Sequence, residues 1–374
     1  MKHFLDTYKI NGLMVTCLLV NLDAATAVLF VTYAATKVAG HDAWLAPLVA
    51  TPATLLLIYA LYHLGKLYPG KTLIEYLPLL LGKVLGKLIG AGYLVFFSWI
   101  TVVVVREFIE VYLGTGVFTV TPPLIMALTL LMLTTYATYS GIEVIARSML
   151  LVWGPMLGLF MVVMLMSIPL MDLKNLLPVG EAGVLPILRS SIIPHMWRGE
   201  IVLLAMLFPY IRTYREGLKG ARVAIFLLAG LVTLNVLTVI AVDGAAATSR
   251  NLFSIFLLAE YIPFFSAKIL VVILWIMSFY GKIALLQFCV TQGLAQWLGL
   301  QDYKSLVLPI GVLLIILPLA IFHNTTDLFN AVFKIFPGFA LIFEYMLPVL
   351  LLFIGLMRAR VASMSGVEKV EPEK

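Results

Sequence analysis

Long runs of apolar residues with hardly any charge recur along this chain, and they restrict its fold more than any other feature. Several runs are about 18–25 residues long, which is the length that a helix needs to cross roughly 30 Å of hydrocarbon. Because 62% of the 374 residues are hydrophobic and only 12% are charged, the chain has too few polar residues to cover a soluble globule. Apolar and polar residues do not alternate over long stretches, which argues against a membrane β-barrel. The sequence therefore predicts an all-α polytopic membrane protein.

We expect ten transmembrane helices. Their approximate bounds are 10–36, 43–63, 84–112, 122–139, 141–170, 191–211, 221–245, 263–290, 305–322 and 333–357. Ten spans divide into two sets of five whose corresponding helices run in opposite directions, and this is the pattern of a five-plus-five inverted repeat. The expected parts are a first repeat (1–170), an external loop (171–190), a second repeat (191–357) and a cytoplasmic tail (358–374).

Basic residues are distributed unequally between the two sides of these spans. One set of loops, together with both ends of the chain, carries sixteen Lys and Arg residues, and the opposite loops carry six. Cytoplasmic loops of membrane proteins are enriched in Lys and Arg. We therefore expect both termini in the cytoplasm.

Polar residues lie near the middle of the first and sixth spans, which are corresponding helices of the two repeats. The first span contains Asn21 and Asp23, and the sixth contains Arg198, Gly199 and Glu200. In transporters built from inverted repeats, discontinuous helices at the bilayer midplane expose free backbone groups to the substrate. The sequence thus predicts interruptions in helices 1 and 6, and a binding site between them.

Alternatives remain open for each of these groups. The segment that follows Asn21 holds no Gly or Pro, so the first helix could also continue unbroken. Arg198 and Glu200 are two residues apart and do not face each other on a regular helix, so each needs another partner. For Arg198 the candidates are Asp23 and Asp243. These charges could also form purely structural ion pairs.

Lys282 lies directly after Gly281 in the middle of the eighth span, where its side chain cannot easily reach either surface. It is predicted to be paired, to replace a coupling cation, or to carry a proton. Structural roles are expected for the Arg106–Glu110 pair, which has i,i+4 spacing, and for Asn235 and Glu344 as internal hydrogen-bonding groups. Neither a phosphate loop nor a zincin-type motif is found, so we expect no enzymatic activity, no cofactor and no metal. Cys17 and Cys289 are predicted to be buried thiols.

Three segments resemble the spore germination permease family, the B-type subunits of germinant receptors. The first is TYATYSGIEVIARSMLL at 135–151, in which Tyr136, Gly141, Glu143, Ala146 and Arg147 match the family pattern. The second is the segment at 67–90, and the third is the loop at 173–191 followed by MWRGEIVLLAMLFPY. The order of the segments extends the resemblance over nearly the whole chain. By its spacing, the Glu143–Arg147 pair is expected to be structural.

The resemblance implies membership of the amino acid–polyamine–organocation superfamily and its inverted five-plus-five fold. Family members sense germinants, often amino acids, in the inner membrane of bacterial endospores, together with an A-type membrane subunit and a C-type lipoprotein. Carried over by position, the site would be lined by Asn21, Asp23, Ala24, Phe97, Thr101, Trp197, Arg198, Gly199, Glu200 and Gly281, with Lys282 and Asp23 as ion or proton groups. Relatives carry a Gly-rich break in helix 1 where this chain reads VNLDAAT, so Asp23 suits an α-amino group or a cation better than a carboxylate.

Three functions therefore compete. The chain could be a germinant sensor whose ligand shifts a conformational equilibrium that partner subunits transmit. It could be a proton-coupled amino acid or polyamine transporter that uses the same site. It could also be an inert scaffold, although charged groups buried in two matching helices make this reading energetically expensive.

Overall fold

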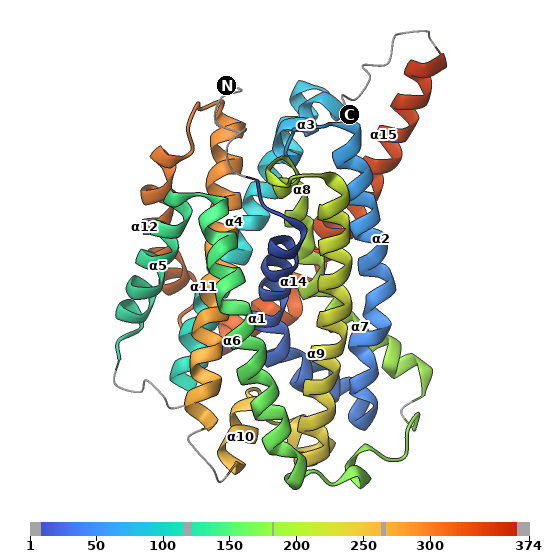
Figure 1. Ribbon diagram of the computed structural model, residues 1–374, viewed down its shortest axis with the longest axis vertical. Coiled ribbons are helices and arrows are strands. Elements are labelled where there is room, and N and C mark those ends of the chain that lie inside the picture. The colour runs from blue at the N-terminus through green and yellow to red at the C-terminus, as the bar shows by residue number, and fades with distance from the viewer. Residues whose placement is uncertain (1–8, 115–120, 182, 263–266, 365–374) are drawn as a thin grey trace.

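The computed structural model describes residues 9–114, 121–181, 183–262 and 267–364 of the chain. In these ranges the regular elements are helices, most of which run along the long axis of the molecule (Figure 1). Among the described residues, nine segments are long and apolar enough to cross a membrane. The first of them, Gly12–Leu67, contains two helices, because a 3₁₀ turn at Gly40–Leu45 separates α1 (Gly12–Ala39) from α2 (Ala46–Leu67). The chain is thus an integral, multi-pass membrane protein.

The elements that follow α2 in the first half agree closely with the predicted spans. They are α3 (Leu73–Leu81), which is too short to span, and α4 (Lys83–Gly114), α5 (Pro123–Ser140) and α6 (Ile142–Ser167). The segment after α6 forms short 3₁₀ turns, and it is held by backbone and side-chain hydrogen bonds from Asp172 and Asn175 to the carbonyl oxygen of Ala241. The loop that follows α6 therefore packs back onto the bundle.

The second half begins with α7 (Val184–Gly199), which starts earlier than the predicted span. It continues through a 3₁₀ turn at Glu200–Leu203, α8 (Leu204–Leu207) and a second 3₁₀ turn at Phe208–Tyr210. The remaining helices are α9 (Tyr214–Thr248), α10 (Ser254–Tyr261), α11 (Ala267–Leu298), α12 (Lys304–Ile321), α13 (Thr325–Asn330), α14 (Phe336–Ala340) and α15 (Leu347–Met364).

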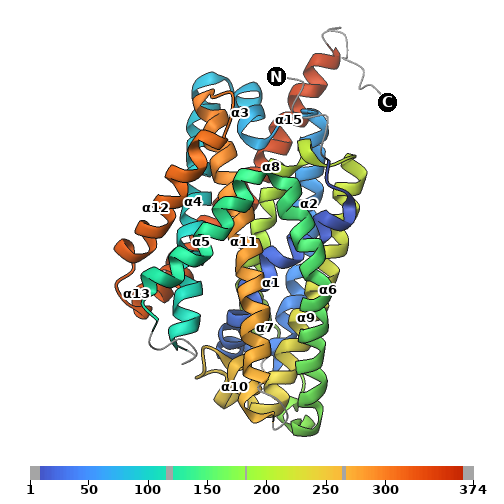
Figure 2. The ribbon, with the colours of Figure 1, turned by 60° about the vertical axis from the view of Figure 1, so that its left-hand side comes forward.

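Helix α1 is the core of the bundle. Most of its side chains are buried, because α6, α7, α9 and α11 all pack against it (Figure 2). A helix that is apolar on every side is expected in such a central position. Asn21, Asp23 and Thr26 are therefore enclosed by other helices.

The predicted interruption of the first span is wrong: α1 is one regular helix from Gly12 to Ala39. Its polar residues do not need an unwound backbone, because neighbouring helices supply their partners. The side-chain amide of Asn21 donates to the carbonyl oxygen of Ser278, and Asp23 faces Arg198. With good helix formers and without Gly or Pro around these positions, the backbone keeps its hydrogen bonds.

The sixth span is interrupted where expected. The α-helix ends at Gly199, and residues Glu200–Leu203 form a tighter 3₁₀ turn. Backbone hydrogen bonds join Ile10, just before α1, to Tyr210 and Arg212 at the end of the sixth span. The start of the first span and the end of the sixth span therefore lie at the same end of the bundle, and the two spans run in opposite directions. This is the relation that an inverted repeat requires.

The last span is irregular in a way that the sequence did not predict. Two π-helical turns, Ala331–Ile335 and Leu341–Met346, flank α14, which contains Pro337 and Gly338. Single π-helical turns within a helix occur often at functional sites. The second turn carries Glu344.

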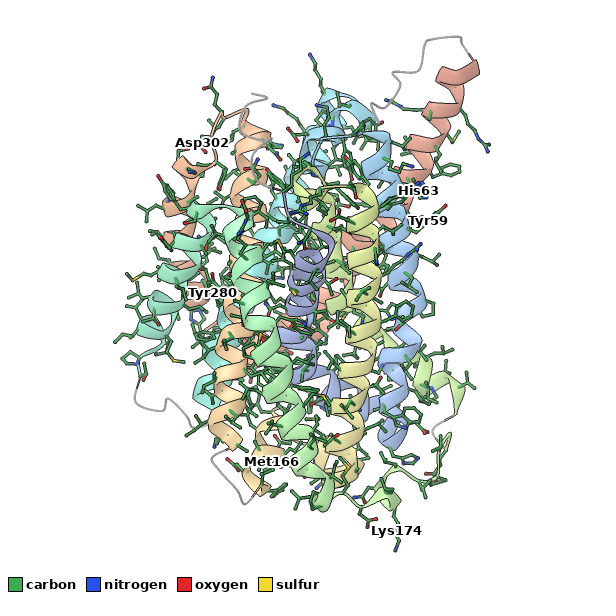
Figure 3. All side chains as sticks on the ribbon, viewed as in Figure 1. Tyr59, His63, Met166, Lys174, Tyr280 and Asp302 are labelled. Atoms are coloured by element: carbon green, nitrogen blue, oxygen red, sulfur yellow. The ribbon has the colours of Figure 1, made fainter. Side chains whose placement is uncertain are left out.

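The two ends of the bundle differ in their residues. Figure 3 shows His63 and Asp302 near one end of the long axis and Lys174 at the other. The end with His63 also contains α3 and the start of α12 (Figure 1), with Lys66, Lys71, Lys83 and Lys87 beside α3 and Lys304 at the start of α12.

Candidate ligand site at the centre of the helix bundle

Lys282 forms a buried ion pair that connects three spans. Its Nζ atom lies 2.7 Å from Glu200 Oε2, and it donates hydrogen bonds to Glu200 Oε1 at 2.9 Å and to Thr26 Oγ1 at 2.8 Å. Lys282 has no exposed surface, and Glu200 and Thr26 are also buried. The pair thus links α11 to α1 and to the 3₁₀ turn of the interrupted span.

Arg198 makes a second, looser pair on the same interrupted span. Its Nε atom lies 3.7 Å from Asp23 Oδ2, so of the two candidate partners Asp23 is the one that the structure selects. Its Nη1 atom donates to the carbonyl oxygen of Pro47 at 2.5 Å and to Thr51 Oγ1 at 3.1 Å. Helix α2 therefore holds one end of the guanidinium, while the other end faces α1.

Several polar atoms in this second pair lack hydrogen bonds. Both carboxylate oxygens of Asp23, and Nε and Nη2 of Arg198, are buried without a partner. A separation of 3.7 Å is longer than a direct hydrogen bond, and such a gap suits a bridging polar group. Buried donors and acceptors without hydrogen bonds are costly, so a polar ligand or a water molecule could donate to Asp23 and accept from Arg198 here.

Gly281 permits the close approach of α11 to α1 and α6. A Cβ atom at this position would lie 2.2 Å from Asn21 Nδ2 and 2.1 Å from Met149 Sδ. The Asn21 amide donates instead to the carbonyl oxygen of Ser278 at 2.9 Å. Gly281 and Asn21, both predicted site residues, thus contact one another and act in helix packing.

Gly199 is fitted against Glu344 of the last span. A Cβ atom at Gly199 would lie 1.9 Å from Glu344 Oε2 and 2.8 Å from Cε2 of Tyr345. The Tyr345 hydroxyl donates to the carbonyl oxygen of His195 at 2.9 Å. The π-helical turn of the last span therefore packs directly on the break in the sixth span, and Glu344, which we expected to be a hydrogen-bonding group, makes no hydrogen bond through either oxygen.

A small pocket lies on the other side of the break. It is lined by Glu107, Glu200 and Trp197, together with the apolar side chains Ile100, Val103, Val104, Val332 and Phe336. Glu107 is 1% exposed, and its Oε2 atom has no hydrogen-bond partner. A pocket of about 10 Å³ holds about one water molecule. The site is closed in this conformation, and a larger ligand requires the helices to separate.

The other predicted site residues lie at different distances from this centre. Trp197 lines the pocket and stacks on Phe30 with ring centroids 6.1 Å apart. Phe97 is buried in an aromatic cluster with Tyr93 and Phe96, and its carbonyl oxygen accepts a hydrogen bond from Thr101 within the same helix. Ala24 lines a separate apolar pocket beside Trp153 and Trp275.

The Glu143–Arg147 pair is outside the centre. Arg147 Nε donates to Glu143 Oε1 at 2.8 Å in the first turns of α6, and the Arg147 side chain is largely exposed. The Arg106–Glu110 pair is also formed, with Glu110 accepting a further hydrogen bond from Thr325. In the described part of the chain, no group of three or more His, Cys, Asp or Glu side chains is arranged to hold a metal ion.

The chain matches a known protein family over most of its length. The family whose description is "Spore germination protein" matches residues 9–327. The chain belongs to this spore germination protein family. Spore germination protein KB from Bacillus subtilis (strain 168) is 27% identical over 333 residues, which cover 87% of this chain and 89% of that protein. Spore germination protein YndE from the same organism is 24% identical over 375 residues, 96% of this chain and 99% of the relative.

The fold of this spore germination protein is similar to the folds of two solved structures. The crystal structure of MhsT in complex with L-phenylalanine superposes with a TM-score of 0.66 at 15% identity, covering 92% of this chain and 88% of that one. The substrate-bound, outward-open state of a Na⁺-coupled sialic acid symporter gives a TM-score of 0.64 at 10% identity, covering 90% and 79%. The likeness confirms the predicted fold class.

Two parts of the site were not predicted from the sequence. The first is Glu107, which directly follows Arg106 in the sequence. On a helix Glu107 points away from the face that carries Arg106 and Glu110, so that pair does not neutralise it. Thr26 and the α2 acceptors at Pro47 and Thr51 carry no charge, and only the packing of α1 and α2 around the sixth span identifies them as partners.

Proposed function

We propose that this chain is the B-type, germinant-sensing subunit of a spore germinant receptor, and that it binds a small molecule, an amino acid by preference, at the membrane midplane. The proposal rests on its family and on one observation above all. The Lys282–Glu200–Thr26 contact connects three spans at the point where the sixth span is interrupted.

A ligand at this point can act on the fold through its charges. Each buried charge needs an opposite charge beside it, because an isolated charge in this environment is strongly unfavourable. A ligand that supplies its own ammonium or carboxylate group can exchange partners with Lys282, Glu200, Arg198 or Asp23. If it binds one arrangement of α1, α7 and α11 better than another, it shifts the population between them, and this is all that sensing requires.

The proposed partners are those of the family. They are an A-type membrane subunit and a C-type lipoprotein, in the inner membrane of the bacterial spore, with both termini of this chain in the cytoplasm. Residues 1–170 and 191–357 form the two repeats, and residues 171–190 form the external loop. The proposed cytoplasmic tail begins at residue 358, and its described part, up to Met364, is the end of α15.

Germination of spores tests the proposal. Spores that carry Asp23→Asn or Glu200→Gln are expected to need at least about tenfold more germinant for half-maximal response, because the carboxylate can then no longer form a charge-assisted hydrogen bond with the ligand. Glu260→Gln is the matched control, since Glu260 forms an exposed pair with Lys268 away from the centre. Immunoblots of spore membranes check that all variants are inserted. A normal dose response in both central variants contradicts the proposed site.

A second candidate function is transport. The likeness to a protein named as a Na⁺-coupled symporter, and a fixed ammonium bonded to α1 and the sixth span, support a proton-coupled amino acid or polyamine carrier. Uptake of labelled amino acids by the purified chain in liposomes distinguishes the two. Saturable, proton-dependent accumulation by this chain alone favours the carrier, and binding without accumulation favours the sensor.

A further inference from the structure

The central cluster contains more carboxyl groups than cations. Four buried acids, Asp23, Glu107, Glu200 and Glu344, lie around two buried cations, Arg198 and Lys282. The two ion pairs use Asp23 and Glu200, which leaves Glu107 and Glu344 without a cationic partner in the described part of the chain. A buried carboxylate without a partner costs several kcal/mol or more, so each must be neutralised by a proton or by a cation from outside the chain.

The two unpaired acids differ in their surroundings. Glu344 is packed against Gly199, where even a methyl group would overlap with it, so no space for a ligand is left beside it. Glu107 lines the small pocket, with one oxygen that accepts no hydrogen bond. Glu200 lines the same pocket, and its Oε2 atom contacts Lys282 without a hydrogen bond of its own. Two carboxylates from α4 and the interrupted span thus border one space.

We propose that the Glu107–Glu200 pocket binds the primary ammonium group of the ligand, and that Glu107 is the residue that selects it. This inference rests on the proposed function and specifies its ligand as an amine. A primary ammonium carries three N–H donors, which suits two carboxylates on opposite sides of one space. It also supplies the positive charge that Glu107 lacks.

The walls of the pocket favour an organic amine over a bare metal ion. Trp197 forms one side, and an ammonium near an indole face gains cation–π attraction. The other walls are aliphatic or aromatic, and these suit a hydrocarbon chain attached to the ammonium. The pocket in this closed conformation has room for the head group alone, so the aliphatic part is accommodated when the flanking helices α4 and the last span move.

Thermal unfolding of the purified full chain in detergent tests the inference. The probes are n-propylamine, L-alanine, propionamide and KCl, all at constant ionic strength with NaCl. The variants are Glu107→Gln, which keeps the size of the side chain, and Glu260→Gln as an exposed control. We expect saturable stabilisation of the wild type and the control by n-propylamine, and by L-alanine through its ammonium group. Glu107→Gln should weaken both effects at least about tenfold, and propionamide should have no effect.

Other outcomes separate this inference from the function on which it rests. If L-alanine stabilises the wild type and Glu107→Gln equally, the chain binds an amino acid elsewhere, and the role of Glu107 is contradicted. If KCl stabilises the wild type as strongly as n-propylamine and loses its effect in Glu107→Gln, the pocket takes an inorganic cation, and the amine is wrong. If neither amines nor any of the common amino acids stabilise the chain, both the proposed function and this inference fail. Should Glu107→Gln not fold, Glu107→Asp, which keeps the carboxylate on a shorter stem, is expected to bind n-propylamine more weakly than the wild type but measurably.

Discussion

Lys282 and Glu200 form an ion pair of 2.7 Å in which the lysine side chain has no exposed surface. The two residues come from α11 and from the 3₁₀ turn that interrupts the sixth span. Since Thr26 of α1 accepts a hydrogen bond from the same ammonium, the three spans that the inverted fold brings to its centre are joined through one atom. We propose that a ligand at the midplane moves the helices by rearranging this contact.

Removal of one member of the pair should destabilise the chain more than removal of both. Lys282→Met leaves Glu200 buried without a cation, and a loss of about 3–5 kcal/mol in the free energy of unfolding is expected. The double variant Lys282→Met/Glu200→Gln should recover part of that loss. Denaturant unfolding in detergent micelles measures both. If the losses of the two single variants simply add in the double variant, the residues are not coupled in the folded protein.

Gly199→Ala should disturb the contact between the sixth and last spans. The new methyl group meets the Glu344 carboxyl and the Tyr345 ring, and overpacking of this kind costs about 1–3 kcal/mol. Gly158→Ala in α6 is the matched control, because nothing lies within 4 Å of the added Cβ atom. Combining Gly199→Ala with Glu344→Ala should restore part of the melting temperature. Equal melting temperatures for Gly199→Ala and Gly158→Ala would show that the packing at Gly199 is different from the one described.

Gly281→Ala should separate α11 from α1. The added methyl group displaces Met149 and the Asn21 amide, so the hydrogen bond from Asn21 to Ser278 is lost. We expect a destabilisation of about 1–3 kcal/mol, whereas Gly230→Ala, with open space around its Cβ position, should be neutral or slightly stabilising. In a background of Asn21→Ala, the cost of Gly281→Ala should fall. An unchanged cost in that background argues against the contact.

The orientation in the membrane can be tested with single cysteines. Cys17 and Cys289 are both buried, so Cys17→Ala/Cys289→Ala provides a background without thiols. Lys174→Cys should react with a membrane-impermeant maleimide in intact cells, and Asp302→Cys only after permeabilisation, because the two positions lie at opposite ends of the bundle (Figure 3). The opposite pattern of labelling would reverse the assigned topology.

The sequence predicted the positions of the spans well because hydrocarbon thickness fixes their lengths. It also predicted the break at Gly199, where a residue of low helix propensity meets charged neighbours. It was wrong about α1, because polar side chains at the midplane do not require an unwound backbone when other helices provide partners, as Ser278 and Arg198 do for Asn21 and Asp23. The π-helical turns near Glu344 could not be predicted from the pattern of apolar residues, and Pro337 and Gly338 alone do not specify them. The bounds of the two repeats and the ligand roles of the site residues stay predictions.

Equilibrium binding of tritium-labelled amino acids to the purified chain is the most direct test of a ligand site at the centre. Wild-type protein and Glu200→Gln, in which the amide oxygen can still accept a hydrogen bond from Lys282, are compared by scintillation proximity, with their melting temperatures recorded without ligand. We predict saturable binding of at least one amino acid to the wild type and at least about tenfold weaker binding to the variant. Equal affinities in both proteins, or no saturable binding of any amino acid to the wild type, would contradict a sensor built around Glu200.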